Sequence, residues 1–420
     1  MHHLNLFSSS NNCSTPNDAS NNRSNHNGTR RNSYTQTAHS RVRRRSLMPW
    51  LVFLFSTLLC SQSAYAEWGL NMPRGVTPVS ENVYDLHMII FYICCAIAVV
   101  VFGIMFWSIF HHRKSKGHKA AHFHESTLVE IIWTLIPLVI LILMAIPATK
   151  AVFAMYNYDD AELDIQITGY QWKWRYNYIG EDIDYFSVLS TPKSQITNES
   201  DKGENYLLEV DRPLVLPVGK KVRFLLTSND VIHSWWVPEL AVKKDTIPGF
   251  INEAWTLIKE PGIYRGQCAE LCGQDHGFMP VVVKAVPEDE YNAWLAEQKE
   301  LKAIEIAKAA EAAAKVWDMD KLMTLGKTVY DQSCAACHQA NGEGIPPVFP
   351  GLKDSPITKG DIAEHVRIVL HGRTGTAMAA YAPQLTDADV AAVVTYERNA
   401  WTDNPPADNL IQPSDIAQYR

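Results

Sequence analysis

Two long apolar runs dominate the first third of the chain. They cover residues 86–110 and 127–148, and each is long enough to cross a bilayer as a helix. The loop between them carries four Lys and Arg residues, so the positive-inside rule places this loop in the cytoplasm. The pattern therefore predicts a two-helix transmembrane hairpin within residues 67–155, with the remainder of the mature chain in the periplasm.

After the second apolar run, hydrophobic and polar residues alternate with a period of two. Short runs rich in β-branched and aromatic residues are separated by Pro, Gly and Asp turns over residues 156–287. This spacing is typical of an all-β sandwich or barrel. The expected strands lie within 163–178, 206–210, 221–228, 253–258, 262–268 and 280–286.

The last third of the chain changes again. Residues 288–320 are rich in Ala, Glu and Lys, which predicts a helical linker. A compact segment follows over 321–403, and a tail rich in Pro and Asp covers 404–420. The division into several units agrees with a length of 420 residues, which is too long for one ordinary domain.

The first 66 residues have the composition of a leader. Residues 1–46 are rich in Asn, Ser and Arg and have little to bury, which predicts disorder. The stretches "RVRRR", "LMPWLVFLFSTLLC" and "SQSAYA" then have the order of a signal peptide, with cleavage after Ala66. A lipidated Cys60 is an alternative that Leu59 disfavours, because it is a poor residue before a lipoprotein cysteine.

Removal of this leader makes the protein strongly acidic. The leader holds seven Arg and one Asp, so the net charge of −7 for the whole chain becomes −13 for the mature part. Such a surface attracts basic partners and repels nucleic acid.

The sequence "CAACH" at Cys334–His338 has the spacing of a c-type haem attachment site. Two thiols at this spacing bond to the two vinyl groups of a haem, and the adjacent His338 becomes an iron ligand. A zinc site would need two further soft ligands, and no cysteine follows Cys337. The compact segment therefore predicts one covalent haem c.

The second axial ligand of this haem follows by elimination. Met378 is the single methionine after His338, and Met/His ligation raises the potential of a haem, as suits an electron carrier. His365 and His371 are the alternatives, and the helical pattern around His365 predicts a histidine on a solvated surface. The segment resembles a small class I cytochrome c domain, which is helical.

A second cofactor motif lies in "GQCAELCGQDHGFMP", where Cys268, Cys272, His276 and Met279 fall within twelve residues. Soft sulfur ligands select copper or zinc. Zinc has no use for the methionine, and a mononuclear blue-copper site has no use for the second thiolate. Two thiolates can bridge two coppers, each capped by one histidine. His233 is the candidate for the second cap, because no other histidine lies between Glu125 and His276.

Four stretches carry a family resemblance that covers residues 85–286. The stretches "GYQWKWRYNY", "HSWWVPEL", "KKDTIPGFINEAW" and "PGIYRGQCAELCGQDHGFMPVVV" resemble subunit II of haem–copper cytochrome c oxidases. The haem segment after them is similar to the caa-type variant, in which cytochrome c is fused to subunit II. The resemblance implies a cupredoxin Greek-key barrel that carries the binuclear copper centre CuA.

The resemblance also implies roles for individual residues. The copper ligands would be His233, Cys268, Cys272, His276, Met279 and the backbone carbonyl of Glu270. The Glu270 side chain would reach a magnesium ion at the contact with subunit I. Trp172, in "QWKW", matches the residue at which electrons are accepted. Glu130, in "VEIIW", matches the acid at the mouth of a proton channel, and an ionisable group inside an apolar helix is itself a functional hypothesis.

These patterns lead to one main functional hypothesis. The chain would be the electron-input subunit of a cytochrome c oxidase in a bacterial inner membrane. It would accept electrons from a soluble basic donor such as cytochrome c and associate with subunits I and III. Oxygen would be reduced to water, with proton pumping, on subunit I. The alternatives are a CuA subunit of a nitrogen-oxide reductase and a non-enzymatic periplasmic copper-binding protein.

Overall fold

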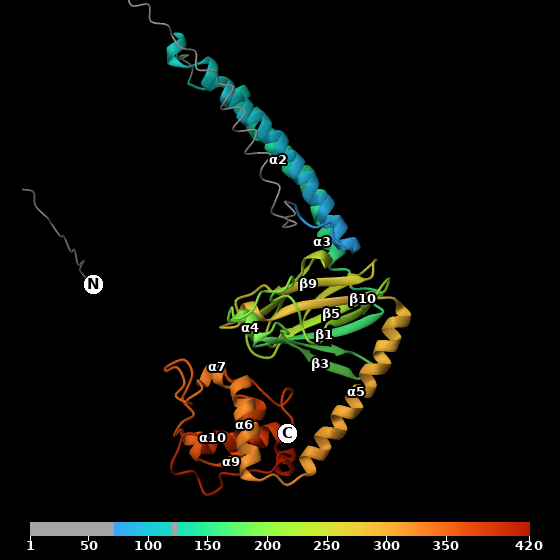
Figure 1. Ribbon diagram of the computed structural model, residues 1–420. Coiled ribbons are helices and arrows are strands. Elements are labelled where there is room, and N and C mark those ends of the chain that lie inside the picture. The colour runs from blue at the N-terminus through green and yellow to red at the C-terminus, as the bar shows by residue number, and fades with distance from the viewer. Residues whose placement is uncertain (1–70, 120–123) are drawn as a thin grey trace, which may run out of the picture. The chain divides into compact units, whose positions relative to one another are not determined.

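The computed structural model describes residues 71–119 and 124–420 (Figure 1). The leader and signal peptide expected over residues 1–66 lie outside the described residues. Along the described chain, a pair of long helices is followed by a β domain, a further long helix and a small helical domain. This order of elements confirms the predicted fold class.

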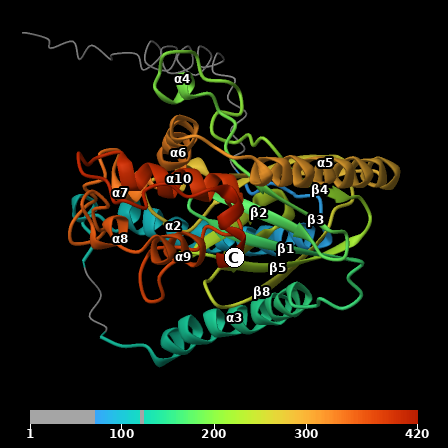
Figure 2. The same cartoon turned by 90° about the horizontal axis from the view of Figure 1, so that it is seen from below.

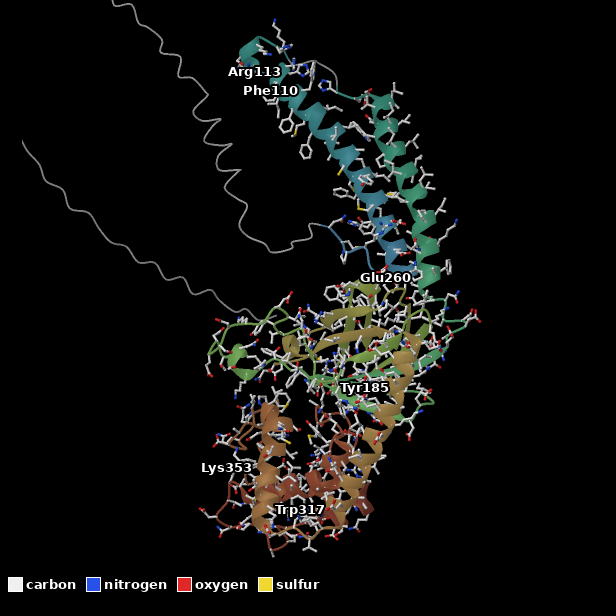
Figure 3. All side chains as sticks on the ribbon, turned by 45° about the vertical axis from the view of Figure 1, so that its right-hand side comes forward. Phe110, Arg113, Tyr185, Glu260, Trp317 and Lys353 are labelled. Atoms are coloured by element: carbon white, nitrogen blue, oxygen red, sulfur yellow. The ribbon has the colours of Figure 1, made fainter. Side chains whose placement is uncertain are left out.

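The two long helices are α2, Pro78–His111, and α3, Thr127–Met155. Thr77 caps α2 with a reciprocal pair of hydrogen bonds to Ser80, which satisfies two otherwise unpaired N–H groups. Both helices are long and apolar enough to cross a membrane. They lie side by side, and Phe110 and Arg113 mark the end of α2 that leads into the connecting loop (Figure 3).

The β domain consists of two five-stranded sheets. Figure 2 labels the strands of one of them, β1, β2, β3, β5 and β8. One sheet has the order β3-β2-β1-β5-β8 and the other β4-β10-β9-β6-β7. Neighbours are antiparallel except β1 with β5 and β4 with β10. The strands are β1 (Leu163–Tyr170), β2 (Lys173–Tyr178), β3 (Ile183–Ser187), β4 (Leu214–Pro217), β5 (Lys221–Ser228), β6 (His233–Val237), β7 (Val242–Thr246), β8 (Asn252–Leu257), β9 (Gly262–Cys268) and β10 (Pro280–Val286).

Alternating side chains form the core of the β domain. In β5, Val222, Phe224 and Leu226 are buried, while the residues between them are half-buried. Trp174 and Trp235 are fully buried, and the Trp235 ring lies 5.1 Å from the Phe224 ring. Burial of a Phe-sized side chain contributes roughly 1.5–3 kcal/mol, so this aromatic core is a main source of the domain's stability.

The run over 163–178 reads as one strand in the sequence but forms two in the structure. β1 ends at Tyr170 and β2 begins at Lys173, and these two residues face each other in an antiparallel pair. Gln171 and Trp172 are therefore the turn between the strands, at one end of the domain.

The strand predicted over 206–210 is wrong. Residues 204–207 form a turn, and Leu207 has a φ of 61°, which is incompatible with a strand. Val210 pairs with Leu189 in an isolated bridge. Conversely, β3, β4, β6 and β7 were not expected, because these short strands lie outside the clear alternating runs.

The linker helix α5, Glu288–Ala314, is fastened to the β domain over its first half. Tyr291 is buried in the core of the β domain, and Trp294 packs against the same core. Further along, Lys302 Nζ lies 2.8 Å from an oxygen of Asp184. The beginning of the linker is therefore part of the β domain rather than a free spacer.

The C-terminal domain is helical, as expected for a cytochrome c domain. The helix that contains Gly326 and the helix that contains Ala392 pack with their backbones in close contact, because a Cβ at Gly326 would lie 2.1 Å from the Ala392 carbonyl oxygen. The helices are α6 (Met319–Ser333), α7 (Ala335–His338), α8 (Pro356–Lys359), α9 (Ile362–His371) and α10 (Asp387–Asn399).

The segment expected as a separate tail over 404–420 packs into this domain instead. Ile411 and Ile416 belong to its buried core. The Gln412 side chain donates to the Trp317 carbonyl at 3.0 Å and accepts from the Trp317 N–H at 2.9 Å; Trp317 is labelled in Figure 3. The helical domain thus extends beyond residue 403, because spaced apolar residues among the prolines complete its core.

Candidate functional site

The sheet register brings together the two parts of the proposed copper site. β6 begins at His233 and pairs with β9, with Trp235 opposite Cys268. Cys268 ends β9, and the loop after it returns to β10 directly after Met279. His233 therefore lies beside this ligand loop although 35 residues separate it from Cys268 in the sequence.

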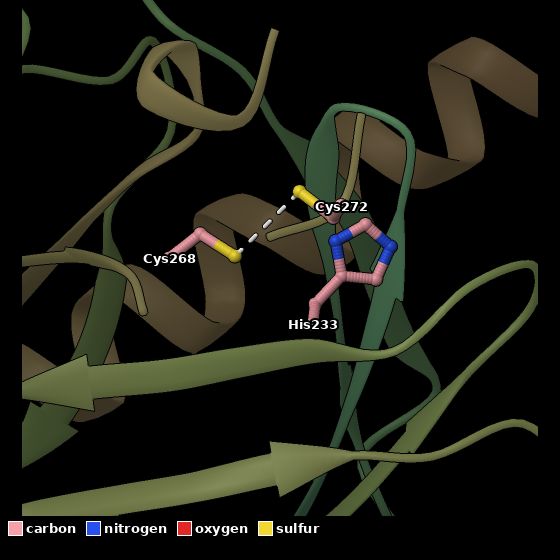
Figure 4. A group of neighbouring side chains, drawn as sticks. All are labelled: His233, Cys268 and Cys272. Atoms are coloured by element: carbon pink, nitrogen blue, oxygen red, sulfur yellow. Dashed lines mark hydrogen bonds between the residues drawn. The ribbon is translucent and has the colours of Figure 1, made fainter. Parts of the chain in front are cut away.

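The sulfur and nitrogen atoms of this loop converge around Cys272. Its Sγ lies 3.8 Å from Cys268 Sγ, 3.4 Å from His276 Nδ1 and 3.6 Å from Met279 Sδ. Figure 4 shows the two thiols beside the His233 ring, and donor atoms of these three residues lie within 4.8 Å of one another. All the residues expected as side-chain ligands of copper are therefore brought into one cluster.

The chemistry of the cluster fits a copper centre. The sulfur–sulfur distance of 3.8 Å excludes a disulfide, and both cysteines are buried. His233 Nδ1 is buried without a hydrogen-bond partner within the described chain, which leaves its lone pair available to a metal. The Cys268 Sγ also lies 3.4 Å from the Glu270 carbonyl oxygen, so this carbonyl reaches the cluster.

The two thiols affect each other's protonation. The hydrogen bond from Cys272 lowers the pKa of Cys268, although burial opposes this change, and the same contact raises the pKa of Cys272. A coupled pair of this kind loses its protons in two separate steps. Because thiolates are the metal-binding form, the lowered pKa of Cys268 favours metal binding at this sulfur.

The Glu270 side chain differs from its carbonyl, because it is exposed. The cluster of possible metal ligands found among the described residues does not include its carboxylate.

The turn between β1 and β2 contacts the ligand loop directly. Trp172 is half-buried, and its indole N–H donates to the Cys272 carbonyl at 3.1 Å. The Gln171 side chain donates to the same carbonyl at 2.9 Å. Trp174, in contrast, is fully buried and donates to the Met279 carbonyl at 3.3 Å. One tryptophan of "QWKW" is thus at the surface of the site and the other in its core.

Asp230 is a residue of this site that the sequence reasoning missed. Its Oδ1 lies 2.8 Å from His233 Nε2, and its Oδ2 accepts from the Gln171 N–H at 2.7 Å. A signal was present in the sequence, since Asp230 lies three residues before the candidate ligand His233. Its role depends on a fold that brings Gln171 alongside.

The CAACH motif occupies the short helix α7 directly after α6. His338 is buried, and its Nδ1 lies 2.8 Å from the Pro350 carbonyl oxygen. Because a carbonyl only accepts, Nδ1 carries the proton and Nε2 has the free lone pair that an iron needs. Cys334 and Cys337 are half-buried and free. This arrangement fits a haem held by two thioethers and one histidine.

Met378 is half-buried in the loop between α9 and α10. Its carbonyl accepts from the Arg373 N–H at 3.0 Å, which closes a tight loop. Three residues later, the Tyr381 hydroxyl donates to the Ser333 carbonyl at 2.8 Å, immediately before Cys334. The methionine loop is therefore tied to the haem-attachment motif.

The two alternative histidines have other contacts. His371 is exposed, and its Nε2 lies 2.7 Å from the Tyr419 carbonyl oxygen. His365 is buried, with Nε2 2.8 Å from the buried Glu397 carboxylate. The expectation that His365 lies on a solvated surface is therefore wrong, because α9 turns this side of the helix toward α10.

Glu130 lies in the first turn of α3, and its side chain is exposed. This places it near the loop that connects the two long helices, away from the copper and haem motifs in the sequence.

Comparisons with protein families cover most of the described chain. The family "Cytochrome C oxidase subunit II, transmembrane domain" matches residues 65–151, and "Cytochrome C oxidase subunit II, periplasmic domain" matches residues 163–286. Residues 321–396 match "Cytochrome C oxidase, cbb3-type, subunit III". The copper ligand cluster lies within the second match and the haem motif within the third.

Curated relatives agree with these families. The "Probable cytochrome c oxidase subunit 2" of Rickettsia prowazekii is 37% identical over 248 residues, which are 59% of this chain and 77% of the relative. The "Cytochrome c oxidase subunit 2" of Metridium senile is 40% identical over 246 residues, 57% of this chain and 94% of the relative.

Among solved structures, the periplasmic domain of subunit II of cytochrome oxidase of Bradyrhizobium japonicum is 38% identical. It matches 33% of this chain and 95% of that chain, with a TM-score of 0.30. From the family matches and the curated relatives together, this chain belongs to the cytochrome c oxidase subunit II family, with a cytochrome c domain following its cupredoxin domain.

Proposed function

We propose that this chain is the electron-input subunit of a respiratory cytochrome c oxidase. Electrons from a soluble donor would enter a covalent haem c, continue to the CuA site, and leave for subunit I, where oxygen is reduced with proton pumping. The observation that carries this proposal is the convergence of two cysteines, two histidines and a methionine at one end of the β domain, in a chain that also bears CAACH. His233, Cys268, Cys272, His276 and Met279 would hold a copper centre, which would supply one-electron transfer.

The protein would contribute a rigid set of soft donors. His233, Cys268 and Cys272 are buried, so water cannot compete freely for the metal positions. Trp172 donates to the Cys272 carbonyl, which offers a short covalent and hydrogen-bonded connection from the protein surface to a bridging ligand. This contact supports the assignment of Trp172 as the residue at which electrons are accepted.

The haem would be held between His338 and Met378. Hydrogen bonding of His338 Nδ1 to Pro350 fixes the orientation of the ring, and the Met378 loop is tied to the residue before Cys334. A thioether as the second ligand would keep the haem potential high enough for it to accept electrons from the soluble donor.

The net charge supports a basic donor such as cytochrome c. The mature chain carries −13, so association with a basic protein would be fast at low salt and slower as ionic strength rises. The two apolar helices would anchor the chain in a bacterial inner membrane beside subunits I and III, with both redox domains in the periplasm. Glu270 would contribute to a magnesium site at the contact with subunit I.

The composition of the purified complex tests this proposal. We expect two coppers and one haem c on this chain, and an electron paramagnetic resonance spectrum of one unpaired electron shared by both coppers. Oxygen consumption driven by reduced cytochrome c would separate the oxidase from a nitrogen-oxide reductase. Zinc at the site, or the spectrum of a single localised copper, would overturn the copper assignment.

Glu130 would admit protons from the cytoplasmic side. Glu130→Ala is then expected to slow turnover several-fold, because a proton donor in the first turn of α3 is lost, while the copper and haem spectra stay unchanged. Glu125→Ala, which removes an exposed acid just before the same helix, is the matched control. Equal turnover in both variants and the wild type would show that Glu130 is only an acid that reaches water.

A further inference from the structure

The carboxylate of Asp230 lies at the centre of the contacts that surround the copper site. Its side chain is only 6% exposed. Oδ1 lies 2.8 Å from His233 Nε2 and accepts from the Val231 N–H at 2.7 Å, while the Ser228 hydroxyl is 3.4 Å away. Oδ2 accepts from the Gln171 N–H at 2.7 Å. Several donors thus stabilise a buried carboxylate anion.

The contact with His233 fixes which ring nitrogen can bind a metal. Because an ionised carboxylate only accepts, His233 Nε2 carries the proton and donates it to Asp230. The lone pair is then on Nδ1, which is buried and has no hydrogen-bond partner within the described chain. His233 belongs to the cluster with the two thiols, so this nitrogen is the one available to a metal there. A carboxylate on the remote nitrogen also makes a histidine a stronger donor to a metal.

The contact with Gln171 extends the same carboxylate to the other side of the site. The Gln171 N–H is held by Asp230, and the Gln171 side chain donates to the Cys272 carbonyl at 2.9 Å. The neighbouring Trp172 indole donates to that carbonyl at 3.1 Å. The Asp230 carboxylate therefore contacts the histidine ligand and the turn that contains Trp172, and through this turn it is connected to the loop that holds both cysteines.

We propose that Asp230 is a positioning residue of the electron-transfer site, which orients and strengthens His233 as a ligand and holds the Trp172 turn against the ligand loop. This inference rests on the proposed function of the copper site. It assigns Asp230 two effects that act together: the potential of the copper centre, through His233, and the rate of electron transfer from the haem, through the turn.

Asp230→Asn in the full oxidase complex tests this role, because asparagine keeps the size of the side chain and removes its charge. The potential of the copper centre is expected to rise, since a nearby negative charge stabilises the more positive oxidised state. Electron transfer from the haem is expected to slow by about 10-fold to 100-fold, the range over which loss of the partner behind a metal-bound histidine lowers the activity of metal sites. Copper content and the haem spectrum should stay close to those of the wild type.

Asp245→Asn is the matched control. Asp245 lies on β7, which pairs with the strand β6 that begins at His233; its side chain is exposed, and the variant removes the same charge. If Asp230→Asn and Asp245→Asn have the same copper potential and transfer rate, Asp230 has no positioning role. If the wild-type complex contains no copper, the proposed function fails, and this result is distinct from a failure of the Asp230 assignment.

A measurement on the unmodified complex keeps the test independent of whether the variant folds. Pulsed electron paramagnetic resonance detects the remote nitrogens of metal-bound histidines, and their couplings report the strength of the N–H hydrogen bond. One remote nitrogen is expected to show a bond to a charged acceptor, and selective labelling should assign it to His233. A His233 remote nitrogen with the coupling of a water-bonded imidazole would overturn the proposal.

Discussion

Replacing Cys272 with serine is expected to abolish the shared-electron copper signal. Its Sγ contacts Cys268 Sγ, His276 Nδ1 and Met279 Sδ, so it is the atom on which the other loop donors converge. A serine oxygen is a harder ligand than a thiolate, and the serine side chain is shorter. The hydroxyl also remains protonated at neutral pH, so it cannot bridge two coppers as a thiolate does. The complex should retain at most one copper per chain, with a localised spectrum or none.

The loss should be specific to the metal. Serine fits where cysteine was buried, and an unsatisfied buried hydroxyl costs about 1–3 kcal/mol, which the β domain should tolerate. Cys94→Ser is the control, because Cys94 is exposed on α2. Copper and haem analysis with electron paramagnetic resonance compares the two variants. An unchanged copper signal in Cys272→Ser would exclude the bridging role.

Replacing Met378 with alanine is expected to lower the haem potential and to remove the sulfur-to-iron band in the near infrared. Without the thioether, the oxidised iron is stabilised relative to the reduced iron, so the haem potential falls. The haem then accepts an electron from the donor less readily. The CuA centre should still be loaded, but electron transfer from the external donor to copper should fall steeply. Redox titration and stopped-flow kinetics measure the two effects.

Met323→Ala is a suitable control for Met378→Ala. Met323 lies in α6 and packs against the core of the same domain, so its loss weakens packing without removing the proposed ligand. It should keep the near-infrared band. If Met378→Ala also keeps this band and the oxidase rate, Met378 is not the ligand, and His371 becomes the next candidate.

The sequence was informative where chemistry depends on local spacing. The four donors between Cys268 and Met279 lie in one loop, and CAACH lies in one turn, so the motifs identify themselves without a fold. The period-two alternation of β5 likewise follows from a sheet with one buried face. Helices α2 and α3 were evident because each contains an uninterrupted apolar run long enough to cross a bilayer.

Features that depend on contacts distant in the sequence could not be predicted. Asp230 lies 59 residues after Gln171, and its contact with that backbone N–H exists only because β1 and β5 are parallel neighbours. The break at Gln171 and Trp172 was hidden because polar and aromatic residues continue the alternation across the turn. His365 was misjudged for the same reason: Glu397, which pairs with it, is brought close only by the packing of α9 against α10.

The packing of residues 404–420 changes the boundaries at which the cytochrome c domain could be excised and transferred to another protein. The segment supplies Ile411 and Ile416 to the core, and Gln412 binds the backbone of Trp317 before the first helix of the domain. A fragment that contains only residues 321–403 would lack both Trp317 and Gln412, and with them these two hydrogen bonds. A fusion of this haem domain to another oxidase should therefore include both the end of the linker, with Trp317, and the final residues 404–420.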